Sequence, residues 1–335
     1  MSNKVIIAVD AMGGDHGVSV AVPAALRLLK KKNHLEIVLV GQQAVIDQTL
    51  DGAKHERLHI QDASQIVDMD EPPADALRKK KDSSMRVAIN LVKEGRAHAC
   101  VSAGNTGALM ATSRFVLKTL PGIDRPAIMA IVPTKIGRSY MLDLGANSEC
   151  SSEQLFQFAV MGSVVVSGIE GLEGEPKVGL LNIGEEDIKG NDTIRNAAVL
   201  ISESNLNYVG FIEGDAIPDQ KADVVVCDGF SGNVALKTME GTAKLVAHFL
   251  KREFRGTPYG WLAGFFALPV LRSLRKRLDP RRYNGASLVG LNGIVVKSHG
   301  GADELAMAQA IKVAMLEVEK KVPEQIRQVM SALGH

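Results

Sequence analysis

Six stretches of this sequence combine glycine with side chains that can hydrogen-bond an anion, and each follows a short apolar run. They are Asp10–Gly17 (DAMGGDHG), Ser102–Gly107 (SAGNTG), Asp143–Asn147 (DLGAN), Asn182–Asn191 (NIGEEDIKGN), Cys227–Asn233 (CDGFSGN) and Lys297–Asp303 (KSHGGAD). Glycine lets backbone N–H groups approach a ligand, and the N-terminus of a following helix adds partial positive charge. Repetition of the pattern favours a site for phosphate, or for a developing oxyanion, over isolated turns.

The stretch Ser102–Ala111 (SAGNTGALMA) admits two interpretations. Its amides could hold an anion, or Asn105 or Thr106 could simply be the N-cap of a helix. For this stretch alone the two interpretations are about equal by ordinary capping preferences. The five similar stretches favour the site.

The stretch Gly184–Asn191 (GEEDIKGN) is the most charged of these loops. Lys189 offsets the acids of Glu185–Asp187 and could reach a substrate phosphate. Those acids could instead orient Lys189 or bind a metal. A solvated loop with a helix cap at Asn191 or Asp192 is the alternative, but charges at the carboxyl ends of strands favour a ligand site.

The histidines and some missing signatures narrow the chemistry. His16 and His299 lie in glycine stretches and could act as acids or ligands. His55 and His59 have the spacing of helical metal ligands, but a polar surface segment is the better interpretation. The dinucleotide, phosphate-loop and serine-hydrolase signatures (GxGxxG, GxxxxGK[ST] and GxSxG) are missing. Anion binding without them indicates phosphate itself or a small phosphorylated compound.

Short apolar runs alternate with helical patterns along the chain. Strands are predicted at Val5–Val9, Glu36–Val40, Ala99–Ser102, Ile128–Val132, Tyr140–Leu144, Val178–Asn182, Tyr208–Ile212, Asp223–Cys227 and Ile294–Lys297. Helices are predicted at Val18–Lys32, Ala44–Leu50, Ser84–Glu94, Thr106–Lys118, Ser152–Ser167, Thr193–Glu203, Asn233–Arg252 and Asp303–Gln328. The order predicts an α/β fold, a doubly wound, mostly parallel sheet with helices on both faces. All six glycine stretches should then gather at its carboxyl edge.

Size and composition fit an ordinary globular chain. A single catalytic domain over residues 1–335 is expected, with residues 170–176 as the boundary if there are two lobes. The net charge of +1 gives no argument for nucleic-acid binding. Cys100, Cys150 and Cys227 are odd in number and widely spaced, which indicates the cytoplasm. No stretch resembles a signal peptide or reaches the ~20 apolar residues of a membrane-spanning helix.

The motifs extend from Val9 to Gly300. They are VDAMGGDHG, SSMRVAINLVKEGRAHACVSAGNTGALM, LDLGAN, LLNIGEEDIKGN, VVCDGFSGNVALKTMEG and YNGASLVGLNGIVVKSHG. In this order they resemble the PlsX family, the acyl-ACP:phosphate acyltransferases of bacterial phospholipid synthesis. The departure near Val18, where a proline is expected, affects a turn.

The resemblance implies transfer of a long-chain acyl group from acyl carrier protein (ACP) to inorganic phosphate, giving acyl phosphate and free ACP. It also implies a fold related to phosphotransacetylases and isocitrate dehydrogenases, and a homodimer. The family's product feeds a membrane-bound glycerol-3-phosphate acyltransferase. Phosphate is already a nucleophile at neutral pH, so positioning and preorganised donors suffice. No cofactor and no metal are expected.

Site roles are assigned on this basis. Lys189 would bind phosphate and stabilise the transition state. Asn233 would hold phosphate or oxyanion, together with the amides around Ser231 and Gly232. Asp15 and His16 would shape the site or protonate the leaving thiolate. Further phosphate or acyl-phosphate contacts are expected from Ser102, Gly104, Asn105, Thr106, Asn147, Gly229 and His299.

Residues 251–282 do not fit the sheet pattern. They carry nine Lys or Arg residues against Glu253 and Asp279, a local excess of seven positive charges. This composition predicts an inserted amphipathic hairpin that binds an anionic membrane peripherally. The predicted membrane-binding residues are Trp261, Leu262, Phe265, Phe266, Leu268, Arg272, Arg275 and Lys276. A helical arm in a dimer interface is the alternative, which the excess charge disfavours.

Other partners and functions stay open. The basic run Arg78, Lys79, Lys80 and Lys81 could bind ACP, which is strongly acidic, and both basic runs could instead be solvated faces. Helices Asn233–Arg252 and Asp303–Gln328 could form dimer contacts. A short-chain phosphotransacetylase using acyl-CoA would give the hairpin no obvious role. A non-catalytic membrane scaffold would leave the glycine stretches unused.

Overall fold

The computed structural model describes residues 4–172, 174–277 and 279–333, except the side chains of residues 275–277. The strands are β1 (Val5–Asp10), β2 (Leu35–Gly41), β3 (Leu58–Asp62), β4 (Ala99–Ser102), β5 (Ala127–Pro133), β6 (Arg138–Leu142), β7 (Lys177–Leu181), β8 (Asn207–Ile212), β9 (Val224–Val226), β10 (Ala286–Val289) and β11 (Ile294–Lys297). All predicted strands are confirmed within about two residues of their bounds, as is usual for strand ends. The sequence pattern missed β3, which is a half-exposed edge strand, and β10, which is a short strand between Gly285 and Gly290.

The helices also follow the prediction, except that α3 was not predicted and two further helices are corrected. They are α1 (Val18–Leu29), α2 (Gln43–Leu50), α3 (Pro73–Lys79), α4 (Ser84–Lys93), α5 (Thr106–Leu117), α6 (Ser152–Glu170), α7 (Asp192–Ser202), α8 (Gly229–Gly256), α9 (Pro258–Arg277), α10 (Glu304–Glu319) and α11 (Val322–Ala332), with 3-10 turns η1 (Ile217–Asp219) and η2 (Pro280–Tyr283). The prediction of one helix over Asp303–Gln328 is wrong, because Lys321 takes a positive φ of 51° and separates α10 from α11. The predicted start of α8 is four residues late, since Asp228 already caps this helix.

The strands form one sheet in the order β3-β2-β1-β4-β11-β10-β5-β6-β9-β7-β8. Neighbours are parallel from β3 to β11 and again from β6 to β8. Between these regions, β10 is antiparallel to β11 and β5, and β5 is antiparallel to β6. The mostly parallel fold is confirmed, but its two ends run in opposite strand directions.

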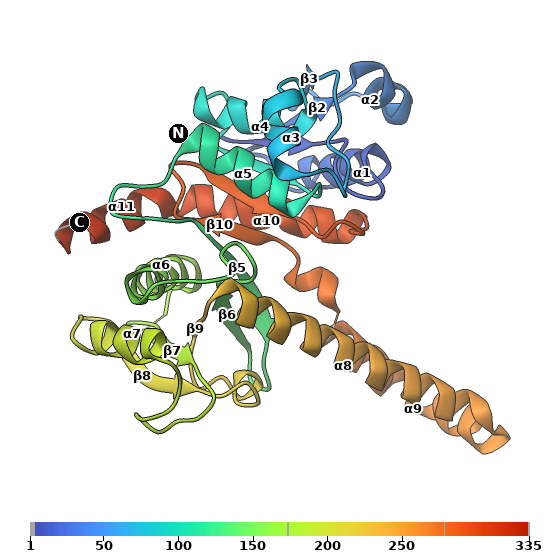
Figure 1. Ribbon diagram of the computed structural model, residues 1–335. Coiled ribbons are helices and arrows are strands. Elements are labelled where there is room, and N and C mark those ends of the chain that lie inside the picture. The colour runs from blue at the N-terminus through green and yellow to red at the C-terminus, as the bar shows by residue number, and fades with distance from the viewer. Residues whose placement is uncertain (1–3, 173, 278, 334–335) are drawn as a thin grey trace.

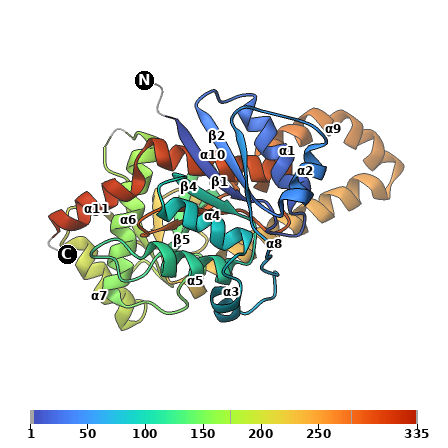
Figure 2. The same cartoon turned by 90° about the horizontal axis from the view of Figure 1, so that it is seen from above.

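Helices cover both faces of the sheet (Figures 1 and 2). In the first half, α1 and α10 pack over Ile7 and Ile37, while α4 and α5 pack over Ala8 and Cys100 on the other face. In the second half, α6 packs on β6 and β9 with Phe158 completely buried, and α11 packs on α6. The apolar layers hold the ends of the strands in fixed positions.

The α8–α9 hairpin projects from the body of the molecule (Figure 1). α8 begins beside β6 and β9 and continues for 28 residues, far beyond the sheet that supports its first turns. No described helix is both long and apolar enough to cross a bilayer.

Candidate active site

The six glycine stretches form two sets, so the expectation that all gather at one edge is wrong. Residues 10–17, 102–107 and 297–303 follow the parallel strands β1, β4 and β11 and form the first loop set. Residues 143–147, 182–191 and 227–233 follow β6, β7 and β9 and form the second loop set. The antiparallel central strands reverse the strand direction between them.

In the first loop set, Ser102 is used inside the protein. Its hydroxyl donates to Asp10 Oδ2 at 2.6 Å and accepts from the Gly104 amide at 3.1 Å. The Asp15 amide donates to the Gly300 carbonyl at 2.9 Å, which joins the loops after β1 and β11. The Ser102 hydroxyl therefore faces Asp10, and a ligand at this set would meet backbone groups and rim side chains.

Four predicted site residues lie at the exposed rim of the first loop set. The side chains of Asp15, His16, Thr106 and His299 are exposed. His299 Nδ1 accepts from the Gly301 amide at 3.1 Å, so its ring is fixed against its own loop. These side chains are accessible to a ligand without rearrangement of the core.

The capping interpretation of Asn105 is confirmed. Its Oδ1 accepts from the Ala108 amide at 3.0 Å and starts α5. Its Nδ2 donates to the carbonyls of Met69 at 2.9 Å and Glu71 at 3.0 Å. Both ends of this amide are thus engaged, and it ties the 64–72 segment to the first loop set.

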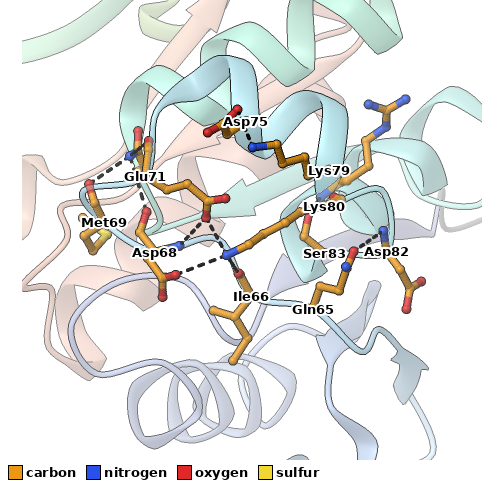
Figure 3. A network of polar contacts seen from close by, with 12 residues as sticks. Gln65, Ile66, Asp68, Met69, Glu71, Asp75, Lys79, Lys80, Asp82 and Ser83 are labelled. Carbon is orange, nitrogen blue, oxygen red and sulfur yellow. Dashed lines mark hydrogen bonds and ion pairs between the residues drawn. The ribbon is translucent and has the colours of Figure 1, made fainter.

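The basic run Arg78–Lys81 borders that segment, and two of its four residues are paired (Figure 3). Lys80 Nζ lies 2.6 Å from Glu71 Oε2, which raises the pKa of Lys80. Lys79 Nζ lies 3.1 Å from Asp75 Oδ1. The run therefore offers less free positive charge to an acidic partner than its sequence suggests.

In the second loop set, Asp143 organises the chain after β6. Its carboxylate accepts from the amides of Ile128 at 2.9 Å and Asn147 at 2.7 Å, and from Asn147 Nδ2 at 2.9 Å. Burial raises the pKa of Asp143, and these hydrogen bonds oppose that change. Asn147 Nδ2 also donates to the Pro126 carbonyl, so its side chain holds the loop together.

The start of α8 approaches that loop closely. The Gly229 amide donates to the Asn147 carbonyl at 2.7 Å. A Cβ atom on Gly232 would lie 1.9 Å from the Asp143 carbonyl oxygen, so glycine is required there. Asp228 caps the helix by accepting from both the amide and the hydroxyl of Ser231. This packing leaves the Asn233 side chain exposed at the first turn.

Lys189 is the exposed cation of the second loop set. Among the residues described, its ammonium has no ion-pair partner, whereas Glu185 pairs with Lys221. The backbone of Lys189 is fixed, because its amide donates to the Glu186 carbonyl at 2.9 Å and its carbonyl accepts from Asn182 Nδ2. Asn191 caps α7, as one interpretation expected. Within the described part of the chain, no group of His, Cys, Asp or Glu side chains could hold a metal.

The three cysteines are held as thiols. Burial raises the pKa of Cys150 to about 12 and those of Cys100 and Cys227 well above the ordinary value. A thiol that stays protonated at neutral pH is a poor nucleophile. An acylated cysteine is therefore disfavoured at this site.

Sequence reasoning missed buried charged residues at the strand ends. Asp10, Asp143 and Lys297 are all buried at the points where the chain leaves the sheet. Burial lowers the pKa of Lys297 to about 8, and Lys237 of α8 adds to that change. The sequence signal that could have identified these three buried residues is their position directly at the end of an apolar run.

The hairpin exposes its apolar residues. Trp261 is 70%, Phe265 64% and Phe266 72% exposed, and the two phenylalanine rings meet edge to face at 5.6 Å. Leu262, Leu268 and Arg272 are exposed as well. The side chains of Arg275 and Lys276 lie outside the described part of the structure.

Comparison with known sequences gives matches over nearly the whole chain. Residues 5–325 match the model of a family described as "Fatty acid synthesis protein". A phosphate acyltransferase of Alkalilimnicola ehrlichii is 60% identical, over 99% of this chain and 98% of its own. One of Halorhodospira halophila is 57% identical, over 97% and 96%.

Solved structures match the fold at low identity. A phosphotransacetylase from Streptococcus pyogenes aligns with a TM-score of 0.63 and 18% identity, over 95% of this chain and 94% of its own. A phosphotransacetylase from Staphylococcus aureus aligns with a TM-score of 0.59 and 17% identity over the same shares. These likenesses support the α/β architecture.

Proposed function

The chain belongs to the fatty acid synthesis protein family, the PlsX family, and is a phosphate acyltransferase; we propose that its acyl donor is a long-chain acyl-ACP. The reaction gives acyl phosphate and free ACP for phospholipid synthesis. The observation that carries the mechanism is the second loop set, where Lys189 is exposed and unpaired among the described residues. Its loop follows β7, and the neighbouring strand β9 leads into the glycine-rich start of α8. Such a site suits an anion that is itself the nucleophile.

In the proposed step, a phosphate oxygen attacks the thioester carbonyl carbon. The carbonyl oxygen takes the negative charge, and then the C–S bond breaks as the carbonyl re-forms. The thiolate leaves and receives a proton from solvent, Asp15 or His16. No covalent acyl-enzyme is needed, which agrees with three cysteines held as thiols.

Lys189 and Asn233 are proposed to contact the reacting groups. An ammonium can hold phosphate and offset the charge of the tetrahedral intermediate. Asn233 sits one turn into α8 and offers an exposed side chain there. The amides of Gly229, Ser231 and Gly232 donate to Asn147 and Asp228 within the protein, so the expected contribution of these amides to the ligand is not carried into the proposal. Thr106 and His299 are proposed to contact phosphate or acyl phosphate from the first loop set, whereas Gly104 is buried and its amide donates to the Ser102 hydroxyl. Ser102, Asn105 and Asn147 would act through the loops that they hold.

The hairpin is proposed to attach the enzyme to membranes. Its exposed Trp261, Phe265 and Phe266 would enter the interface, and its basic residues would meet anionic lipid. Attachment would bring acyl phosphate close to a membrane-bound glycerol-3-phosphate acyltransferase. The enzyme would thus be a cytoplasmic protein with peripheral membrane association.

ACP docking, a homodimer and the domain organisation are further proposals. ACP would meet Arg78 and Lys81, the two members of the run without an ion-pair partner among the residues that the structure describes. The exposed apolar face of α8, which includes Leu245 and Phe249, would be available to a second copy. Residues 1–335 would act as one catalytic unit, in which 251–282 is an inserted hairpin.

The test compares acyl donors of one chain length. Palmitoyl-ACP and palmitoyl-CoA are each incubated with inorganic phosphate, and acyl phosphate is trapped as the hydroxamate. We expect efficient turnover with palmitoyl-ACP. Preference for acyl-CoA, and above all for acetyl-CoA, would instead support the phosphotransacetylase alternative. If no donor gave acyl phosphate, the non-catalytic membrane scaffold would be the remaining interpretation.

A further inference from the structure

Three buried polar residues form a row across the first loop set. Asp10, Ser102 and Lys297 are the last residues of β1, β4 and β11. The strand register pairs Asp10 with Ser102 and Ser102 with Lys297. Their exposed fractions are 1%, 0% and 8%. Burial of polar groups is unfavourable unless each is hydrogen-bonded, so such a row requires a reason.

Each residue of the row holds backbone of a loop. Asp10 Oδ1 accepts from the Gly13 amide at 3.1 Å, and Oδ2 accepts from the Ser102 hydroxyl at 2.6 Å. Lys297 Nζ donates to the Ala103 carbonyl at 3.2 Å and to the Ser298 carbonyl. The row thereby connects all three loops of the first set.

Lys297 stands among opposing charges. Burial lowers the pKa of Lys297 to about 8, Asp10 and Asp15 act to raise it, and Lys237 of α8 acts to lower it further. Burial also raises the pKa of Asp10. His16, His299 and Asp303 are the other titratable groups of these loops, and Asp303 pairs with Arg281. The ammonium is too enclosed to contact a ligand directly, so an effect on catalysis must pass through the carbonyls that it holds.

We infer that the Asp10–Ser102–Lys297 row is a positioning unit, which in its charged state fixes the first loop set for acyl transfer. Loss of the Lys297 proton weakens the hydrogen bonds to the carbonyls of Ala103 and Ser298, because a neutral amine is a weaker donor than an ammonium, and the loops are held less firmly. The catalytic consequence rests on the proposed function. The ordering of the loops does not, and it can be measured separately.

Two substitutions separate charge from size. Lys297→Met keeps the chain length and removes the charge, whereas Lys297→Arg keeps the charge. Lys312→Met is the control, because Lys312 is a lysine on α10 whose pKa is also lowered by burial. Hydrogen exchange at pH 7 is measured on peptides covering 102–107 and 298–303. Peptide 228–233 of the second loop set is the internal reference.

In Lys297→Met we expect exchange to be about tenfold faster in the two first-set peptides and unchanged in 228–233. With palmitoyl-ACP, kcat/KM for phosphate at pH 7 should fall about 10–100-fold, as expected for loops displaced by ~1 Å. Wild-type activity should decline as the pH rises through about 8. That decline should be absent in Lys297→Met and shifted upward by more than about one pH unit in Lys297→Arg.

A third variant tests whether the row acts as one unit. Ser102→Ala should lower kcat/KM about tenfold alone, and add little to Lys297→Met, because residues of one network are not additive. Unchanged exchange in the first-set peptides, equal acceleration in all peptides, or an alkaline decline that persists in Lys297→Met would each overturn the inference. If the wild type forms no acyl phosphate from acyl-ACP, the proposed function fails, and hydrogen exchange still decides on the row.

Discussion

The two loop sets share a glycine-rich sequence pattern but keep their cations in different places. In the first set, Lys297 is 8% exposed and bonded to backbone carbonyls. In the second set, Lys189 is exposed and, within the described residues, unpaired. A buried ammonium can fix geometry, whereas an exposed one can bind an anion. We propose that the buried lysine of the first set positions its loops, whereas the exposed lysine of the second set contacts the reacting groups.

The two sets also share one structural feature, a buried carboxylate at the end of a strand. Asp10 and Asp143 both accept hydrogen bonds from backbone amides. Each carboxylate takes the place of water as the hydrogen-bond acceptor for these amides. What separates the sets is therefore the placement of the lysine, and the predictions below test that distinction.

The largest expected effect is on the exposed cation. Lys189→Met should lower kcat/KM by about 10²–10³-fold, because a preorganised donor to the transition state is lost. The matched control is Lys221→Met, another exposed lysine of the second half, which pairs with Glu185. It should retain activity within about a factor of two, as surface changes usually do. Steady-state kinetics with palmitoyl-ACP measures both variants. Normal activity of Lys189→Met would contradict the proposal that Lys189 contacts the reacting groups.

Close packing of the second set gives the next effect. In Gly232→Ala, the added Cβ would lie 1.9 Å from the Asp143 carbonyl oxygen. The free energy of unfolding should fall by about 3 kcal/mol, the upper range for overpacking. Gly241→Ala lies in the same helix and meets nothing within 4 Å. It should stabilise the protein by about 0.5–1 kcal/mol. Urea unfolding measures the free energy of unfolding of both variants. Changes of the same sign in the two variants would contradict this account.

Burial of the first-set cation predicts a smaller effect that depends on pH. The pKa of Lys297, about 8, lies below its ordinary value of 10.5, so the unfolded chain binds this proton more tightly. Stability of the wild type should therefore rise with pH between these values. Relative to Lys297→Met, the wild type should gain about 2 kcal/mol between pH 7 and pH 9.5. A constant difference in the free energy of unfolding would show that Lys297 does not titrate in this range.

Periodicity predicted most of the fold because the strands of the core are nearly continuous apolar runs. It missed β10, and with it the reversal of direction at the centre of the sheet. Strand direction is set by pairing between segments distant in sequence, which local patterns do not contain. For that reason the six stretches were expected at one edge, although each was correctly located at a strand end.

The site shows a similar limit. The sequence offered helix caps at Asn105 and Asn191 as alternatives to a ligand site, and the structure confirms both caps. The sequence could not show that Ser102 donates to Asp10, or that Lys80 pairs with Glu71, because these contacts depend on segments that meet only in the fold. It also could not separate a buried Lys297 from an exposed Lys189. Their exposure is a property of the assembled sheet edge.

The smallest effect on stability is expected in the hairpin, which lies outside both loop sets. Replacing Trp261, Phe265 and Phe266 together by serine should change the free energy of unfolding by less than about 0.5 kcal/mol, since all three are exposed. Activity with soluble palmitoyl-ACP should persist. Co-sedimentation with phosphatidylglycerol vesicles should be lost, while Ile136→Ser, a change at an 81% exposed apolar residue elsewhere, should bind as the wild type does.

The same triple variant distinguishes lipid binding from a dimer arm. Sedimentation velocity would report a change of oligomeric state if these side chains met a second copy rather than a membrane. We expect an unchanged sedimentation coefficient, because the neighbouring basic residues would be costly to bury against an identical arm. Membrane release with unaltered assembly and unaltered soluble turnover would place chemistry in the two loop sets and localisation in the hairpin, whereas dissociation of the assembly would assign the hairpin to the dimer.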